Sequence, residues 1–315
     1  MPFLVAYLAT DDYVVYTYAA VTLDRLLLLK RDNVPLFTKT DLSPLLQDLL
    51  GSIFQRILVD PRPEKLAEND FLIKCSLPLT LRSLIIGMMR VMVTSRDGLE
   101  PYMPVSTQNL VGILGEISKN PSNPRFNHYL FECLAALIRY EPPTRSFSNP
   151  DHRFVGPTSP ENLTFLESNI VPQLLHILSE NVEGATSHLT HLTECAEFMP
   201  YVFQLLSQLL ESQKTNALSE DYIQLLTPLI NPELWRTKAN TIPLVRLLQA
   251  YLRRGSANVI QSNKLEGILG VWQNLISSKL YDSYGFDLLM TIFLEVPMFV
   301  LRSRAPPVLF VEDYY

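Results

Sequence analysis

Three side chains have the spacing of a metal site. His188, His191 and Cys195 form an H-x2-H-x3-C pattern, and imidazole and thiolate groups are ligands that zinc prefers. A closed structural zinc site needs a fourth ligand, and the surrounding segment, rich in Ser and Thr, offers no evident one. We therefore interpret the three as solvated loop residues, and we expect neither a metal nor another cofactor.

A second histidine and cysteine, His128 and Cys133, lie five residues apart. Side chains that share one helix face are three or four residues apart, so this spacing does not form a ligand pair. Asn-Pro pairs at 120–121 and 123–124 break the chain just before them, because the residue before a proline is pushed out of the helical conformation. We interpret His128 as a first-turn residue of a helix rather than as a catalytic base.

Catalytic signatures are missing from the rest of the sequence. It contains no G-x-S-x-G nucleophile turn, no phosphate-binding loop ending in Gly-Lys-Ser/Thr, no H-E-x-x-H motif and no glycine-rich dinucleotide turn. We therefore expect a protein that is not an enzyme. The alternative is an enzyme or metalloprotein that uses the 188–195 cluster.

The charge and the cysteines narrow the function further. The 315 residues carry a formal net charge of −6, which argues against nucleic-acid binding, because neutralising phosphates requires clustered Lys and Arg. Cys75, Cys133 and Cys195 are an odd number without paired spacing, so we expect reduced thiols in the nucleus or cytoplasm. The apolar run 290–301 is interrupted by Glu295 and Pro297, and we expect no membrane insertion.

Apolar residues recur at helical spacing along the whole chain, and no series of alternating residues predicts a sheet. Each predicted helix begins at a residue that commonly caps helices or starts their first turn, such as Asp12, Ser219 or Thr241. The helices fall into pairs, which we place at 2–9 with 13–30, 42–59 with 70–95, 100–119 with 126–140, 161–182 with 195–211, 220–230 with 241–254, and 264–278 with 284–296.

The starts of these pairs are separated by about 41 to 61 residues, and the shorter separations match the period of HEAT and armadillo repeats. One pair cannot bury its apolar side alone, so neighbouring pairs must stack. The prediction is an all-α fold: a HEAT-repeat (ARM-like) superhelical solenoid of about six helix pairs, an architecture that binds other proteins.

We assign residues 1–297 to this array and 298–315 to an irregular tail, which contains Pro306-Pro307. Three segments interrupt the pattern and are predicted inserts: 76–87, 141–158 and 183–195. Without residues 76–87, the flanking segments join into one amphipathic run.

Three arginines are candidates for contact with a partner. Arg246, Arg253 and Arg254 lie on a predicted helix whose apolar stripe faces the other way. They are either part of a solvated helix face or contacts to an acidic partner. Trp235 and Trp272 are predicted to lie in the core or between repeats.

Several long segments of the sequence resemble the importin-β (karyopherin) superfamily, in particular its receptors that carry importin-α out of the nucleus. These segments occur in the same order as in that family, over about residues 4 to 297. They are YTYAAVTLDRLL (16–27), SKNPSNPRFNHYLFE (118–132), EFMPYVFQLLSQLLE (197–211), LINPELWRTKANTIPLVRLLQAYLRRGS (229–256) and GILGVWQNLISSK (267–279) with GFDLL (285–289).

The resemblance implies a segment of a nuclear export receptor that binds importin-α as cargo together with the GTPase Ran in its GTP form. It also implies nuclear pore proteins as further partners, and shuttling between nucleus and cytoplasm. Receptors of this family have a much longer solenoid, so we expect the sequence to correspond to its central region only. The alternative is a stand-alone HEAT-type scaffold that binds another protein.

Overall fold

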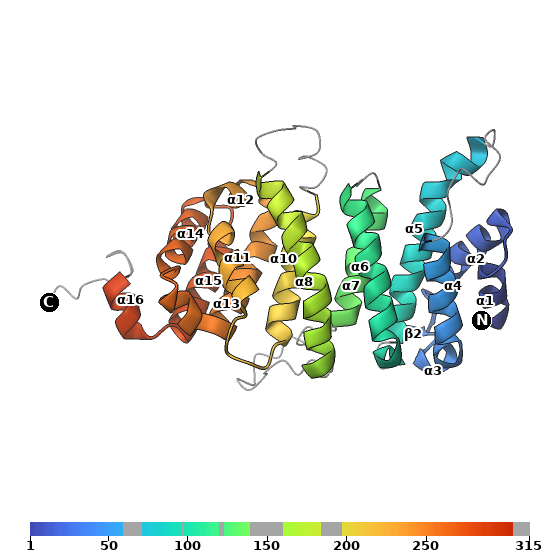
Figure 1. Ribbon diagram of the computed structural model, residues 1–315, viewed down its shortest axis with the longest axis horizontal. Helices are drawn as coiled ribbons and strands as arrows, with labels where there is room; N and C mark the ends of the chain where they lie inside the picture. The colour runs from blue at the N-terminus through green and yellow to red at the C-terminus, as the bar shows by residue number, and fades with distance from the viewer. Residues whose placement is uncertain (59–70, 96–97, 120–122, 139–159, 184–196, 305–315) are drawn as a thin grey trace. The chain divides into compact units, whose positions relative to one another are not determined.

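The computed structural model describes residues 1–58, 71–95, 98–119, 123–138, 160–183 and 197–304 (Figure 1). They form two compact units, the first ending at Phe198 and the second beginning at Met199. Helices make up nearly all of both units, and within the described residues the only sheet is a two-stranded hairpin. The predicted all-α fold is confirmed.

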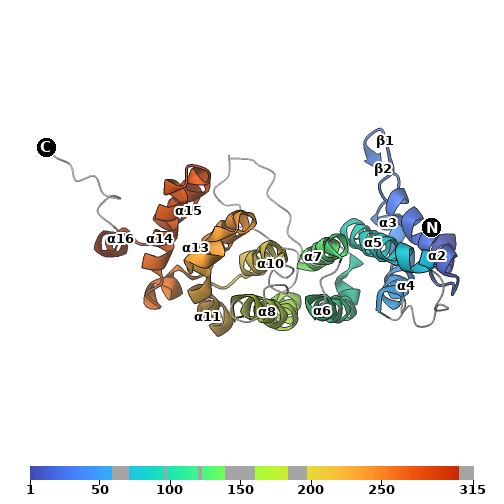
Figure 2. The same cartoon turned by 90° about the horizontal axis from the view of Figure 1, so that it is seen from above.

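The helices of the first unit stack in two layers. One layer contains α4, α6 and α8, and the other contains α2, α5 and α7, so that each helix contacts the next one in its layer (Figure 2). The layers are joined by the contacts of α4 with α5 and of α6 with α7, and α1 contacts both α2 and α4. The bounds are α1 Pro2–Leu8, α2 Tyr13–Leu26, α3 Lys39–Leu42, η1 Ser43–Leu45, α4 Leu46–Leu58, α5 Phe71–Thr94, η3 Glu100–Tyr102, α6 Met103–Lys119, α7 Pro124–Ile138 and α8 Pro160–Glu183.

The second unit is built around one long helix, α13, which contacts α10 on one side and α15 on the other. Shorter helices pack on this row, and α14 lies directly against α15. The bounds are α10 Met199–Ser212, α11 Glu220–Leu229, α12 Pro232–Arg236, α13 Lys238–Gln261, α14 Leu265–Ser277, α15 Asp282–Glu295 and α16 Met298–Arg304.

Helix starts follow the capping signals in part. Asp12 caps α2, since its Oδ1 accepts hydrogen bonds from the backbone N–H groups of Val14 and Val15 at 2.9 and 3.1 Å. The predicted start at Thr241 is wrong, because α13 begins three residues earlier at Lys238. Thr241 lies inside the helix and is buried, whereas Thr237 has the extended conformation of an N-cap.

The hairpin joins α2 to α3 and was not predicted. Its strands, β1 (Lys30–Arg31) and β2 (Val34–Pro35), pair antiparallel. The two turn residues, Asp32 and Asn33, both have positive φ angles, 52° and 65°, which the type I′ turn of a two-residue hairpin requires. Strands of two residues are too short to show an alternating pattern in a sequence.

The segment 76–87 was predicted to interrupt a helix, and this prediction is wrong. It lies within α5, and Leu84, Ile85 and Ile86 are buried. The Thr80 hydroxyl is 2.7 Å from the Tyr13 hydroxyl and 3.1 Å from that of Thr17, so the segment is anchored to α2 by polar contacts too. These contacts join residues more than 60 positions apart, which no local pattern reveals.

The other predicted segments are described only in part. The insert 141–158 lies outside the described residues, and so does 183–195 except for Glu183, the last residue of α8. The tail was predicted to be irregular from residue 298, but its first seven residues form a short helix, α16, and residues 305–315 lie outside the described part. None of the described helices combines the length and the apolar character needed to cross a bilayer.

Candidate partner-binding surface

The helix α13 is held by one apolar stripe. Leu244, Leu247, Leu248, Tyr251 and Leu252 recur at helical spacing and are all fully buried. This burial fixes the rotation of the helix, and it turns the three candidate arginines away from the core.

Arg246 forms an ion pair with α10. Its Nε donates to Oε1 of Glu211 at 3.0 Å and its Nη2 donates to Oε2 at 2.6 Å, a bidentate arrangement of charge-assisted hydrogen bonds. The Glu211 side chain is only 5% exposed, whereas that of Arg246 is 31% exposed. The carboxylate is thus compensated inside the unit, while part of the guanidinium faces solvent.

Arg254 contacts the same residue through the backbone. Its Nη2 donates at 2.6 Å to the carbonyl oxygen of Glu211, in the last turn of α10. The last four carbonyls of a helix lack partners within the helix, and cations near them are favourable. Arg253, in contrast, is exposed and forms no ion pair with a described residue.

A kink follows these arginines directly. Gly255 leaves the helical conformation, with φ −151° and ψ 39°, and a Cβ at this position would lie 2.3 Å from Cγ of Leu218. The backbone of α13 therefore approaches the segment before α11 more closely than any other residue type permits.

Polar contacts continue from α13 to its other neighbour. The side-chain amide of Gln249 donates to the carbonyl of Asp287 and to the hydroxyl of Thr291 on α15, both at 3.1 Å. One polar surface thus runs over α10, α13 and α15, which lie side by side in Figure 2. We define the arginine face as Glu211, Arg246, Gln249, Arg253 and Arg254.

The predicted metal-like residues, His188, His191 and Cys195, lie outside the described residues. Within the described ranges, no three His, Cys, Asp or Glu side chains gather as metal ligands would.

His128 and Cys133 take the places expected for residues of a packed helix. The His128 ring makes an edge contact with Tyr129, at 4.9 Å between centroids, near the start of α7. The Cys133 thiol is fully buried and contacts the carbonyl of Ile85 at 3.8 Å. This burial raises the pKa of Cys133 well above its usual value. The thiolate is the nucleophilic form of cysteine, so a thiol with a raised pKa is unsuited to nucleophilic chemistry.

The two tryptophans differ in their environment. Trp272 is buried, as predicted, whereas Trp235 is half-buried and lines a pocket of the second unit. The only local signal in the sequence that could have predicted this difference is that Trp235 lies close to Pro232 and to the cations Arg236 and Lys238.

Comparison with known proteins decides the family. A family model described as "CAS/CSE protein, C-terminus" matches residues 24–311 of this chain. The chain belongs to the CAS/CSE family. This match confirms the resemblance to receptors that export importin-α, which was based on the sequence segments quoted above.

Individual CAS/CSE proteins agree with this assignment. The chain is 36% identical over 292 residues to "Importin-alpha re-exporter" of Schizosaccharomyces pombe, covering 93% of the chain and 26% of that relative. It is 34% identical over 306 residues to the Saccharomyces cerevisiae protein of the same description, covering 96% and 27%. It is 34% identical over 300 residues to "Exportin-2" of Danio rerio, covering 94% and 26%.

A solved structure supports the solenoid fold. The structure described as "The exportin Cse1 in its cargo-free, cytoplasmic state" matches with a TM-score of 0.67 and 32% identity, over 96% of this chain and 26% of that one. The helical solenoid class predicted from the repeat spacing is confirmed. The chain spans about a quarter of the length of these relatives.

Proposed function

We propose that this chain is a segment of a nuclear export receptor, and that it binds importin-α cargo together with Ran·GTP. The observation that carries the proposal is the match of nearly the whole chain to proteins described as importin-alpha re-exporters. The function is transport between nucleus and cytoplasm, without catalysis, and nuclear pore proteins are further partners.

Within the segment we propose the arginine face as the contact surface. Arg253 is exposed for a direct contact, and the exposed part of Arg246 adds a second positive charge. Arg254 orients the surface through its bond to α10. Exposed cations affect the rate and selectivity of binding to an acidic surface more than its maximal affinity.

Binding measurements with purified chain test this function. Immobilised chain is exposed to importin-α alone, with Ran loaded with a non-hydrolysable GTP analogue, and with Ran·GDP. We expect importin-α to bind measurably only with the GTP-form Ran. Binding that does not depend on the nucleotide indicates the stand-alone scaffold, and absence of binding under all conditions contradicts the proposal.

A variant and a matched control test the arginine face as the contact surface. Arg253→Glu should weaken the ternary complex about tenfold, because it places like charges together at the interface. Arg125, on α7 of the first unit, is also exposed, so Arg125→Glu is the matched control and should leave binding unchanged. Equal binding of both variants excludes Arg253 from the contact.

A further inference from the structure

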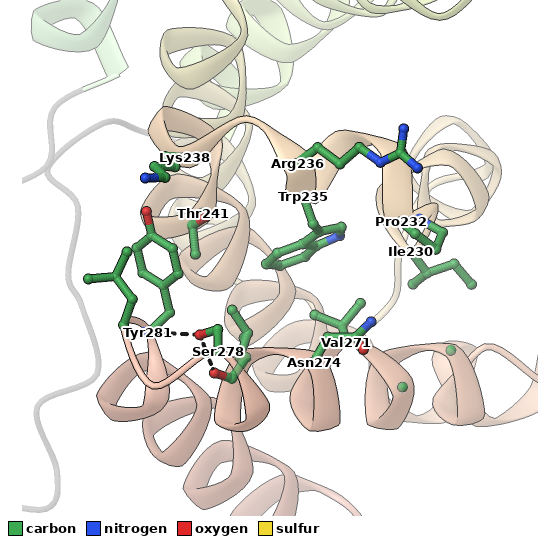
Figure 3. A pocket seen from close by; sticks show the side chains of 14 residues that line it. Ile230, Pro232, Trp235, Arg236, Lys238, Thr241, Val271, Asn274, Ser278 and Tyr281 are labelled. Carbon is green, nitrogen blue, oxygen red and sulfur yellow. Dashed lines mark hydrogen bonds between the residues drawn. The ribbon is translucent and has the colours of Figure 1, made fainter.

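The second unit contains a pocket between α12, the start of α13 and α14 (Figure 3). Its volume is about 510 Å³, within the range of roughly 300 to 1,000 Å³ that is usual for sites that bind ligands. It is separate from the arginine face, and the proposed function does not use it. Its residues include Ile230, Trp235, Lys238, Gly270, Asn274 and Tyr281.

Two aromatic rings form its walls. The Trp235 indole points from α12 toward α14, and its Nε1 donates to the carbonyl of Leu229 at 2.9 Å, which holds the ring in place (Figure 3). The Tyr281 ring lies near Lys238 and Thr241, and the Tyr281 backbone N–H donates to Ser278 Oγ at 3.1 Å. The Trp235 ring, held in this way, loses little entropy when an apolar side chain packs against it, and the Tyr281 bond fixes the backbone that carries the second ring.

The charges around the pocket have one sign. Arg236 and Lys238 are among the described residues that line it, and no Asp or Glu is among them. Arg236 forms an exposed ion pair with Glu233 at 2.8 Å. Lys238 is exposed, makes no ion pair with a described residue, and is the first residue of α13.

The position of Lys238 is unfavourable for the helix by itself. The N-terminus of a helix already carries a partial positive charge, so a cation there is destabilising and an anion stabilising. The N-cap residue, Thr237, provides no side-chain hydrogen bond to the first turn. A carboxylate that approaches this end of the pocket meets two positive groups that the chain itself leaves uncompensated.

One polar side chain could bind a peptide backbone. Asn274 is exposed on α14 and lines the pocket. Its amide offers both a donor and an acceptor, which the N–H and C=O groups of an extended peptide require. We propose that the pocket binds an acidic peptide segment, with an aromatic or large aliphatic side chain between Trp235 and Tyr281 and a carboxylate against Lys238.

A glycine in the pocket allows it to be filled without disturbing the core. A Cβ at Gly270 would meet no atom within 4 Å, so the side chain of Gly270→Leu extends into the pocket. Gly112 in α6 is exposed and is equally free of neighbours, so Gly112→Leu is the matched control. Circular dichroism of both variants should show unchanged helix content.

The indole N–H resonances of the whole ¹⁵N-labelled chain report on the pocket. The chain has two tryptophans, and Trp272 is 6% exposed, which makes it an internal reference. The probe is an acetylated and amidated pentapeptide with phenylalanine between two pairs of glutamates. We expect its addition to shift the Trp235 resonance saturably and to leave that of Trp272 in place.

The variants and a second peptide complete the test. Replacing the four glutamates by glutamines should weaken binding at least fivefold, and Lys238→Glu should weaken it about tenfold. Gly270→Leu should abolish the saturable shift, whereas Gly112→Leu should bind as the wild type does. The proposal is overturned by equal binding of the glutamine peptide, by unchanged binding to Gly270→Leu, or by no Trp235 shift at millimolar peptide.

Discussion

The middle of α13 and its N-terminal end use their positive charges differently. In the middle, Arg246 and Arg254 both bind Glu211, whose carboxylate is buried. At its N-terminal end, Lys238 is exposed at a pocket and makes no ion pair with a described residue. The middle is closed by contacts within the unit, and the N-terminal end is open to a ligand.

This difference shows what a cation contributes in a stacked helical repeat. A charge whose partner lies in the neighbouring helix stabilises the stack, and its removal leaves a buried group uncompensated. A charge without such a partner contributes little to stability and is available for binding. The two kinds of residue therefore separate in experiments that measure stability and binding on the same variants.

The largest effect is expected in the middle of α13. Arg246→Ala should lower the free energy of unfolding by about 3 kcal/mol, because the buried carboxylate of Glu211 then lacks its ion-pair partner. Urea denaturation followed by circular dichroism measures it.

The double variant Glu211→Met with Arg246→Leu is the control for this pair. Removing both charges together should recover most of the lost stability, since an apolar pair of similar size often replaces a buried ion pair without cost. If the double variant is as unstable as the single one, Arg246 stabilises the unit by other means than compensating the Glu211 carboxylate.

The next effect concerns the kink. Gly255→Ala should lower stability by about 2 kcal/mol, since its Cβ would overlap Leu218. Gly270→Ala, in α14 where it lines the pocket, should raise stability by about 0.5 to 1 kcal/mol, because alanine favours a helix and meets nothing there. Thermal unfolding of both variants measures the contrast, and equal shifts of the two contradict it.

Tyr251 lies in the buried stripe of α13, between Arg246 and Arg254 in the sequence, and its hydroxyl donates to the carbonyl of Tyr222 at 2.7 Å. Burial raises the pKa of Tyr251 well above its usual value of 10. The unfolded chain therefore loses this proton at lower pH than the folded chain does. The stability from this group is complete below about pH 10 and falls above it by up to about 1.4 kcal/mol per pH unit.

Tyr251→Phe isolates this contribution. At pH 7 the variant should lose about 1 kcal/mol, because the Tyr222 carbonyl loses its donor. Above pH 10 its stability should fall less steeply than that of the wild type. Parallel curves of stability against pH for the two proteins contradict the assignment.

The smallest effect on stability is expected for the exposed cations. Arg253→Glu should change the free energy of unfolding by less than about 0.5 kcal/mol. Lys238→Glu should raise it by about 0.5 to 1 kcal/mol, because it places an anion at the N-terminus of α13. The same variants should weaken the ternary complex and the peptide complex, respectively. A stability loss above about 1 kcal/mol in either variant shows that the residue has a structural partner.

The helical architecture could be predicted from the sequence because each helix carries its own apolar periodicity. The predicted pair 264–278 with 284–296, for example, corresponds to α14 and α15 within a few residues. The hairpin at 30–35 could not be predicted in this way, because two-residue strands have no periodicity.

The candidate site was predictable only as a set of outward-facing arginines. The helical spacing places Arg246, Arg253 and Arg254 off the apolar stripe, but it does not show which of them has a partner. Glu211 lies 35 residues before Arg246, and only the packing of α10 against α13 brings them together. The pocket was missed for the same reason, since its walls come from two separate segments of the chain.

A chimeric receptor tests the central claim most directly. In the Schizosaccharomyces pombe importin-alpha re-exporter, the 26% that matches this chain is replaced by the 292 matching residues. The affinity of the folded chimera for importin-α is then measured with Ran in its GTP and GDP forms. We predict tight binding with Ran·GTP only, weakened by Arg253→Glu. A folded chimera that fails to bind importin-α with Ran·GTP contradicts the assignment of this segment to nuclear export.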